Sequence, residues 1–244
     1  MTKRKLDAVC VIFARGGSKG LPGKNIKLLN GKPLLGWAIE QAKSVSRIRR
    51  VIVSTDCPEI AKVAIKYSAE VPFLRPKNLS EDDSSEWDAW RHALEYFLED
   101  EGQLPEIFVS IPTTSPLRET IDIDRCLDEY QKGAADIIVT VTDAHRNPWF
   151  NMVTNSDNDL VELVNKPSDK ISGRQYAPIV YDMTTVAYVA SSKFVMEKHG
   201  IFSGRVGAIS IPVERAIDID TLLDFEFASF LINKKEERKI DQSK

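Results

Sequence analysis

The chain has 244 residues, of which 43% are hydrophobic and 28% are charged. This composition excludes a disordered or collagen-like chain, and the length suits one large α/β domain. The 33 basic and 36 acidic residues give a net charge of -3, so no general basic field draws the chain to nucleic acid or to an anionic membrane. No apolar stretch approaches the roughly 20 residues that a transmembrane helix needs. We therefore expect neither nucleic acid nor a membrane as a partner.

Three cysteines, Cys10, Cys57 and Cys126, lie far apart and form no CxxC pair. An odd number of separated cysteines argues against a disulfide framework or a zinc site and favours a reducing compartment. The apolar run at 8–14 follows three basic residues, as in a signal peptide, but Arg15 ends it without a cleavage pattern. We expect a cytoplasmic protein in which this run is a core strand.

Strands and helices are expected to alternate along the chain. Short apolar runs predict strands, and apolar residues at helical spacing predict helices. In chain order, strands are expected at 9–14, 50–55, 70–74, 107–111, 137–142, 180–190 and 208–212, and helices at 34–45, 58–67, 84–98, 121–130 and 221–232. This alternation predicts βαβ units and a mainly parallel sheet within a single domain over 1–244.

Two segments depart from the alternation. Between 143 and 190, Asn, Asp, Ser, Pro and Gly become frequent, and we expect a β-rich excursion or flap within the single domain. The tail from Asn233 to Lys244 is highly charged, and we expect it to fray from the last helix.

The segment at 15–25, RGGSKGLPGKN, carries four glycines and three cations directly after the first expected strand. Glycine lets a backbone approach a ligand, while Arg and Lys bind phosphate oxygens. Because open α/β sheets bind ligands beyond the carboxyl ends of their strands, the segment predicts a triphosphate site. It matches neither the G-x-G-x-x-G pattern nor the P-loop, in which Ser18 would be Gly and Asn25 would be Ser or Thr. An ordinary glycine-rich turn with solvated lysines is the alternative.

Asp218 and Asp220 flank Ile219 shortly before the last expected helix. Alternate residues of an extended segment share a face, so both carboxylates point the same way, and such oxygens suit Mg²⁺. Taken alone, the pair is better explained as a helix cap before Thr221. The predicted triphosphate site at 15–25 is the observation that supports a metal site here.

Two further groups have competing explanations. Asp56 or Cys57 before Pro58 is typical of a helix N-cap, which we favour over a catalytic role. The hydroxyls of Ser84 and Ser85 can cap the next helix or, together with Arg75, hydrogen-bond a base. The residue types do not decide between these two roles.

In combination, these blocks resemble the acylneuraminate cytidylyltransferases, the CMP-sialic acid synthetases. The segment FARGGSKGLPGKN at 13–25 closely resembles the opening signature of that family. Four further blocks follow in the family's order: VSTD at 53–56, LRP at 74–76, TSPLR at 114–118 and DIDT at 218–221. The resemblance runs from about residue 8 to 230.

The resemblance implies a Rossmann-like nucleotidyltransferase fold, with 143–190 as a small dimerisation excursion and a homodimer as the working form. It also implies a reaction between CTP and a nonulosonic, 2-keto-3-deoxy sugar acid. The anomeric hydroxyl of the sugar attacks the α-phosphate, giving a CMP-sugar and pyrophosphate, with Mg²⁺ as the cofactor.

The resemblance also assigns roles residue by residue. The nucleotide would bind to Arg15, Gly16, Gly17, Ser18, Lys19, Lys24, Asn25, Arg75, Ser84 and Ser85. The sugar would bind to Thr113, Thr114, Arg174 and Gln175, with Arg174 supplied by the partner subunit. Asp218 and Asp220 would hold the metal ion, and Arg15, Lys24 and Asp220 would be the catalytic residues.

Two positions depart from the family pattern. Pro112 stands where the family commonly has a glutamine that touches the sugar, and Asp182 stands where it often has an arginine. Both lie on the sugar side, so CTP is better supported than N-acetylneuraminate. Legionaminate, pseudaminate, deaminated neuraminate or a related nonulosonate all stay open. A Kdo-type sugar acid, an alditol phosphate and a non-catalytic nucleotide-binding module are the alternatives.

Overall fold

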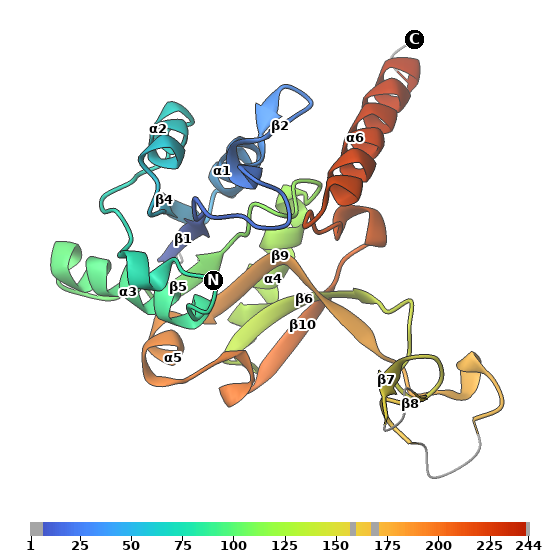
Figure 1. Ribbon diagram of the computed structural model, residues 1–244. Coiled ribbons are helices and arrows are strands. Elements are labelled where there is room, and N and C mark those ends of the chain that lie inside the picture. The colour runs from blue at the N-terminus through green and yellow to red at the C-terminus, as the bar shows by residue number, and fades with distance from the viewer. Residues whose placement is uncertain (1–6, 157–159, 167–170, 243–244) are drawn as a thin grey trace.

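The computed structural model describes residues 7–156, 160–166 and 171–242 (Figure 1). In these residues one twisted six-stranded sheet has the strand order β10-β6-β9-β5-β1-β4. Its strands are β1 Ala8–Phe13, β4 Ile48–Ser54, β5 Ile107–Ser110, β6 Ile137–Asp143, β9 Tyr181–Ser191 and β10 Val206–Ser210. Strand β9 is antiparallel to both β5 and β6, and the other neighbouring strands are parallel. The predicted mainly parallel α/β fold is confirmed.

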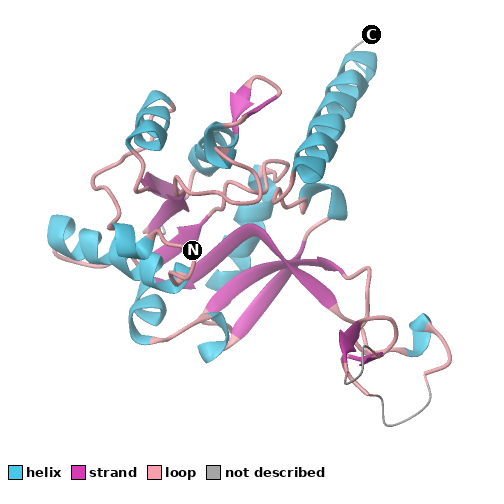
Figure 2. Cartoon of the chain, in the orientation of Figure 1, coloured by secondary structure: helices cyan, strands magenta, loops and turns pink. Residues whose placement is uncertain are grey.

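Helices cover both faces of the sheet (Figure 2). Helices α1 (Leu34–Lys43), α2 (Pro58–Lys66) and α4 (Thr120–Gln131) pack on one face, and α3 (Glu86–Glu101) and α5 (Ser192–Glu197) pack on the other. Strand side chains alternate between the two layers, with Cys10 and Ile12 in the first and Val9 and Val11 in the second. This alternation is why β1 is an unbroken apolar run in the sequence.

Two predicted elements need correction. The strand expected at 70–74 is only an isolated bridge between Ile52 and Glu70. The charged tail does not fray at Asn233, because helix α6 runs over Leu222–Gln242. Lys, Glu, Arg and Gln are good helix formers, so a charged composition is compatible with a continuing helix. None of the described helices is long and apolar enough to cross a membrane.

The segment between β6 and β9 leaves the sheet and forms a separate lobe, at the lower right of Figure 1. It contains the hairpin of β7 (Val153–Asn155) and β8 (Val161–Leu163). We call residues 144–180 the excursion segment, of which 157–159 and 167–170 lie outside the described residues. The prediction extended it to 190, but 181–190 belong to β9, which pairs with central strands on both sides.

A third apolar cluster joins the glycine-rich segment to α6. Leu21 from that segment and Leu29 from the hairpin of β2 (Leu28–Leu29) and β3 (Lys32–Pro33) pack with Ile219 and with Ala228 of α6. This contact brings the segment after β1 beside the residues that precede α6, although the two are separated by nearly the whole chain.

Candidate active site

The glycine-rich loop, residues 15–25, is braced by the loops that follow the strands on either side of β1. The Asp56 carboxylate accepts a hydrogen bond from the Gly16 N–H at 2.9 Å. Asn25 is buried, donates to the Arg15 carbonyl at 2.8 Å and accepts from the Thr113 hydroxyl at 2.6 Å. Because β4, β1 and β5 are parallel, their carboxyl ends meet at one edge and these loops come together.

These braces refine two predictions. Cys57 is the N-cap residue of α2 and Pro58 its first residue, as expected, but the Asp56 carboxylate holds the glycine-rich loop instead of a helix. The Gly16 N–H and the Asn25 amide, which belong to the predicted nucleotide site, are engaged in bonds that hold the loop. Both therefore contribute to the shape of the loop.

The loop encloses a cavity of about 420 Å³, which we call the loop cavity. Its volume falls in the range of small-molecule sites. The lining residues are Phe13, Arg15, Ser18, Lys19, Gly20, Lys24, Asn25, Pro112, Thr113, Thr114 and Asp220. The structure thus brings most of the predicted loop residues together with Thr113, Thr114 and Asp220. Sequence reasoning missed Phe13 and Gly20 here.

Lys24 ties the loop to the segment before α6. Its Nζ donates to the Ile219 carbonyl at 2.9 Å and to Asp220 Oδ1 at 3.0 Å, and only 14% of its side chain is exposed. Gly20 lies against the same segment, because a Cβ at this position would stand 2.5 Å from the Asp220 carbonyl oxygen. The close approach of these two backbones requires glycine at position 20.

Asp218 and Asp220 are both free of the capping role. Asp224 caps α6, because its Oδ2 accepts from the N–H groups of Asp220 and Thr221 at 3.1 and 2.7 Å. Asp218 Oδ1 is buried without a hydrogen-bond partner among the described residues. The Asp220 side chain is 71% exposed. The described residues hold no group of three or more His, Cys, Asp or Glu arranged for a metal.

A second cavity, of about 310 Å³, shares Phe13 and Arg15 with the loop cavity, and we call it the adjoining cavity. Its other lining residues are Arg75, Leu79, Ser80, Glu81, Asp82, Ser84, Ser85, Glu86 and Ala89. The predicted Arg75, Ser84 and Ser85 are therefore brought together, one cavity away from the loop lysines. Sequence reasoning missed Ser80 and Glu81, which lie between Arg75 and the serines.

Arg75 is the buried cation of the adjoining cavity. Its Nε donates to the Ser80 hydroxyl at 2.9 Å, and its guanidinium lies 6.0 Å from the centre of the Phe13 ring. Burial lowers the pKa of Arg75 below its usual value. Ser84 shapes the loop, because its hydroxyl donates to the Asn78 carbonyl at 2.8 Å and accepts from the Glu81 N–H at 2.9 Å.

Asp82, which lines the adjoining cavity, forms ion pairs with two cations of the loop cavity. Its carboxylate lies 3.0 Å from Arg15 Nη2 and 2.5 Å from Lys19 Nζ, and the Glu81 carbonyl accepts from Arg15 Nη1 at 2.9 Å. The hydrogen bond from Lys19 lowers the pKa of Asp82. In the sequence, this acid stands shortly before a helix, where capping is the usual explanation.

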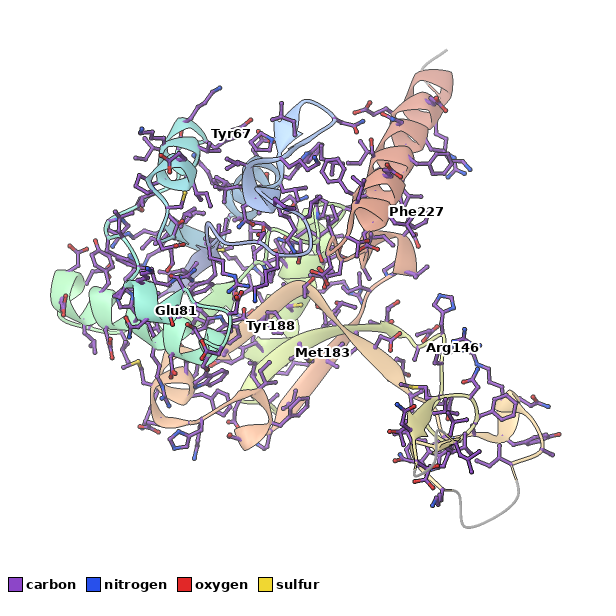
Figure 3. The ribbon with its side chains drawn as sticks, in the orientation of Figure 1. Tyr67, Glu81, Arg146, Met183, Tyr188 and Phe227 are labelled. Carbon is purple, nitrogen blue, oxygen red and sulfur yellow. The ribbon has the colours of Figure 1, made fainter. Side chains whose placement is uncertain are left out.

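Arg174 and Gln175 are not brought to either cavity. They belong to a 3₁₀ turn of the excursion segment, where Arg174 Nη2 donates to the Ala144 carbonyl at 2.5 Å. Figure 3 shows Arg146, from the same segment, far from Glu81 in the adjoining cavity. The excursion segment exposes many large apolar side chains: Phe150, Met152, Val153, Leu160, Val161, Val164, Tyr176 and Ile179.

Comparison with known proteins identifies the family and the fold. A family model described as cytidylyltransferase matches residues 9–238. The post-translational flagellin modification protein B of Campylobacter coli is 33% identical, over 94% of this chain and 96% of its own length. The CMP-N,N'-diacetyllegionaminic acid synthase of Campylobacter jejuni is also 33% identical, over 94% of this chain and 96% of its own length. A solved CMP:2-keto-3-deoxy-manno-octonic acid synthetase complexed with CTP shares the fold, with a TM-score of 0.68 at 16% identity over 93% of this chain and 99% of that chain.

Proposed function

The chain belongs to the cytidylyltransferase family, and we propose that it transfers CMP from CTP to a nonulosonic sugar acid. The relative from Campylobacter jejuni is named for the CMP derivative of such an acid, and it matches this chain over nearly the full length of both proteins. In the reaction, a bond forms between the anomeric oxygen and the α-phosphorus. The bond from that phosphorus to the β-phosphate oxygen breaks, and pyrophosphate leaves.

One observation carries the proposal: a cationic cavity and a second polar cavity meet at Phe13 and Arg15. Arg15, Lys19 and Lys24 supply three positive charges to the loop cavity, which suits a triphosphate. The adjoining cavity offers Arg75, Ser84 and Ser85 for the ribose and cytosine. A bound nucleoside triphosphate would place its phosphates in the loop cavity and its ribose and base in the adjoining cavity.

The loop cations perform most of the catalytic work in this proposal. Phosphoryl transfer needs in-line positioning and neutralisation of developing charge more than covalent help. Arg15, Lys19 and Lys24 hold the β- and γ-phosphates and stabilise the departing pyrophosphate. Lys24 is positioned before substrate arrives, because its Nζ is already held by the Ile219 carbonyl and Asp220.

The segment before α6 is the proposed Mg²⁺ site. Asp218 offers a buried carboxylate oxygen without a partner among the described residues, and Asp220 offers an exposed carboxylate in the loop cavity. Mg²⁺ commonly binds one or two carboxylates and completes its shell with phosphate oxygens and water, so two acids suffice. When bound, Mg²⁺ would neutralise phosphate charge and increase the electrophilicity of the α-phosphorus.

The sugar side is proposed to need a second copy of the chain. Thr113 and Thr114 line the loop cavity, whereas Arg174 and Gln175 lie in the excursion segment, outside both cavities of their own chain. The exposed apolar side chains of that segment form the kind of surface that a subunit interface covers. We therefore propose a homodimer in which Arg174 and Gln175 approach the sugar in the partner's cavity.

A cytoplasmic location is part of the proposal. Cys10, Cys57 and Cys126 are all free thiols in the structure. A reducing compartment keeps such thiols unpaired, and it supplies the nucleotide substrate as well.

The test is pyrophosphate release from CTP with Mg²⁺ and a panel of acceptors. The panel contains legionaminate, pseudaminate, N-acetylneuraminate, a Kdo-type octulosonate and an alditol phosphate, and each acceptor is also tested with ATP, GTP and UTP. Release with CTP and one nonulosonate alone supports the proposal and identifies the sugar. Release only with the octulosonate or with an alditol phosphate redirects the substrate assignment. Tight CTP binding without release from any acceptor contradicts it and favours a non-catalytic nucleotide-binding module.

A further inference from the structure

The carboxylate of Asp82 occupies the cations that the proposed reaction assigns to phosphate. It contacts Arg15 Nη2 at 3.0 Å and Lys19 Nζ at 2.5 Å, one oxygen to each cation. Arg15 also donates to the neighbouring Glu81 carbonyl, so the segment at 81–82 engages the guanidinium twice. An anion that binds both cations therefore shares them with this internal carboxylate or replaces it.

The segment that carries Asp82 is held in place by side-chain hydrogen bonds. The Ser84 hydroxyl links Glu81 to Asn78, and the Ser80 hydroxyl accepts from Arg75 and donates to the Pro76 carbonyl at 3.3 Å. The Asp82 side chain itself is half exposed, at 47%. The Asp82 carboxylate therefore lies beside two cations that are proposed to bind phosphate, on a segment held by hydrogen bonds. Because its side chain is half exposed, it can turn away from them into solvent.

We propose that Asp82 competes with phosphate oxygens for Arg15 and Lys19, so that only a ligand which also fills the adjoining cavity stays bound. This inference rests on the proposed function. CTP gains contacts with Arg75 and its neighbours in addition to the two cations. Pyrophosphate has only the cations, so the same competition leaves it weakly held and speeds its release after transfer.

Three ligands distinguish competition from other roles. Pyrophosphate and CTP both use Arg15 and Lys19, so removal of the Asp82 charge strengthens the binding of both. Cytidine carries no phosphate and therefore makes no charged contact with either cation, so its affinity stays unchanged. If Asp82 instead positions Arg15 and Lys19 for phosphate, its removal weakens pyrophosphate and CTP.

Asp83 provides a matched control for Asp82. It is exposed, adjacent in sequence and of the same charge, and among the described residues it forms no ion pair with a cation. Asp83→Asn removes the same charge from the same loop. It therefore measures how much the loss of one negative charge alone strengthens the binding of an anion.

The experiment is calorimetric titration of pyrophosphate, CTP and cytidine, in Mg²⁺ buffer, into the wild type, Asp82→Asn and Asp83→Asn. For Asp82→Asn we expect about fivefold tighter binding of pyrophosphate and CTP, in line with the loss of two surface ion pairs. The affinity for cytidine is expected to match that of the wild type. In steady-state assays of Asp82→Asn, the inhibition constant of pyrophosphate is expected to fall by the same factor as its dissociation constant. Asp82→Ser repeats the test with a side chain that carries no amide.

Several outcomes overturn the inference. Equal pyrophosphate affinities for Asp82→Asn and Asp83→Asn remove Asp82 from competition, and weaker binding assigns it a positioning role. Pyrophosphate binding that stays undetectable in the wild type and in both Asp82 variants overturns it as well. Failure of the proposed function is separately visible, because it appears as absent turnover in the wild type with every sugar acid, whatever the ratio between variants.

Discussion

The glycine-rich loop and the excursion segment both belong to the proposed site, and they differ in how far a single chain fixes them. The loop is held by the bonds of Asn25 with Thr113, of Lys24 with the segment before α6 and of the Gly16 N–H with Asp56, each in a different part of the chain. The excursion segment is an extended lobe with a short hairpin and many exposed apolar side chains. Under the proposed function, the nucleotide half of the site would be complete within one chain, whereas the sugar half would depend on the subunit that covers the lobe.

The largest expected effect on the loop side comes from Asp220→Asn. This change keeps the size of the side chain and removes a charge from the loop cavity, where the metal is proposed to act chiefly in the transition state. We expect kcat to fall by about a hundredfold or more while the Kd for CTP changes by less than about threefold. Single-turnover and binding measurements check this.

Ser191→Ala is the control, because the Ser191 hydroxyl caps α5, outside both cavities, by accepting from the Phe194 N–H at 2.9 Å. It is expected to lower the free energy of unfolding by about 1 kcal/mol and to leave kcat unchanged. Unchanged kcat in Asp220→Asn would remove this residue from the mechanism.

Gly20→Ala tests whether the loop depends on its contact with the Asp220 backbone. The new Cβ would stand 2.5 Å from a carbonyl oxygen, so the loop must shift. A displacement of this kind is expected to reduce kcat/KM by about tenfold to a hundredfold and stability by about 1–3 kcal/mol. At Gly17 nothing lies within 4 Å of an added Cβ, so Gly17→Ala is expected to leave the melting temperature nearly unchanged. Equal melting temperatures for the two variants would contradict the proposed contact.

Ile179→Asp tests the other side of the comparison. Ile179 is 82% exposed in the excursion segment, so a charge there leaves the single chain stable but disfavours burial in a subunit interface. We expect the dimer Kd to rise about tenfold or more and turnover with the sugar to fall with dimer content, while CTP affinity is retained. Sedimentation and light scattering measure the first effect.

Phe202→Asp is the matched control for this prediction, because Phe202 is 77% exposed outside the excursion segment. It is expected to leave the dimer intact. A wild type that is monomeric and fully active at micromolar concentration would refute the shared sugar site.

The smallest expected effect lies outside both regions and is a pH dependence. His92 packs edge-on against Phe73 at 4.8 Å between ring centres, and burial lowers its pKa. The unfolded chain then binds a proton near pH 6.5 that the folded chain binds only at lower pH. Stability is therefore full above about pH 6.5 and falls as the pH drops below it. Urea unfolding at pH 7.5 and 5.5 should show a smaller decrease for His92→Leu than for the wild type or His199→Gln.

Local sequence patterns predicted the parts of the site that lie on contiguous segments. The loop at 15–25 was recognisable because its glycines and cations are adjacent, and Asp220 was recognisable from its spacing to Asp218. The bonds from Asn25 to Thr113 and from Gly16 to Asp56 were not, because they join residues distant in sequence. Only the parallel packing of β4, β1 and β5 places these residues together.

The excursion was foreseen from composition and misjudged at its end for a related reason. Frequent Asn, Asp, Pro and Gly mark where the chain leaves the sheet, but composition does not say with which strands the returning chain pairs. The apolar residues at 186–190 are typical of a strand in either a flap or a central sheet. The pairing of β9 with β5 and β6 places these residues in the central sheet. Such pairing depends on contacts between residues that are distant in sequence.

The position of β9 has a consequence for the order in which the sheet assembles. β4, β1 and β5 form one parallel group and β6 and β10 another, and within the sheet only β9 connects them. The nearest pairs of β6 with β9 and of β1 with β4 lie only 38 and 40 positions apart in the chain, whereas β5 pairs with β9 across 78 positions and with β1 across 99. Because a longer loop costs more entropy to close, the pairing of β5 is expected to be the slow step. We expect refolding to show two early, separately protected units in hydrogen exchange, β1 with β4 and β6 with β9, and a later step in which the amides of β5 become protected.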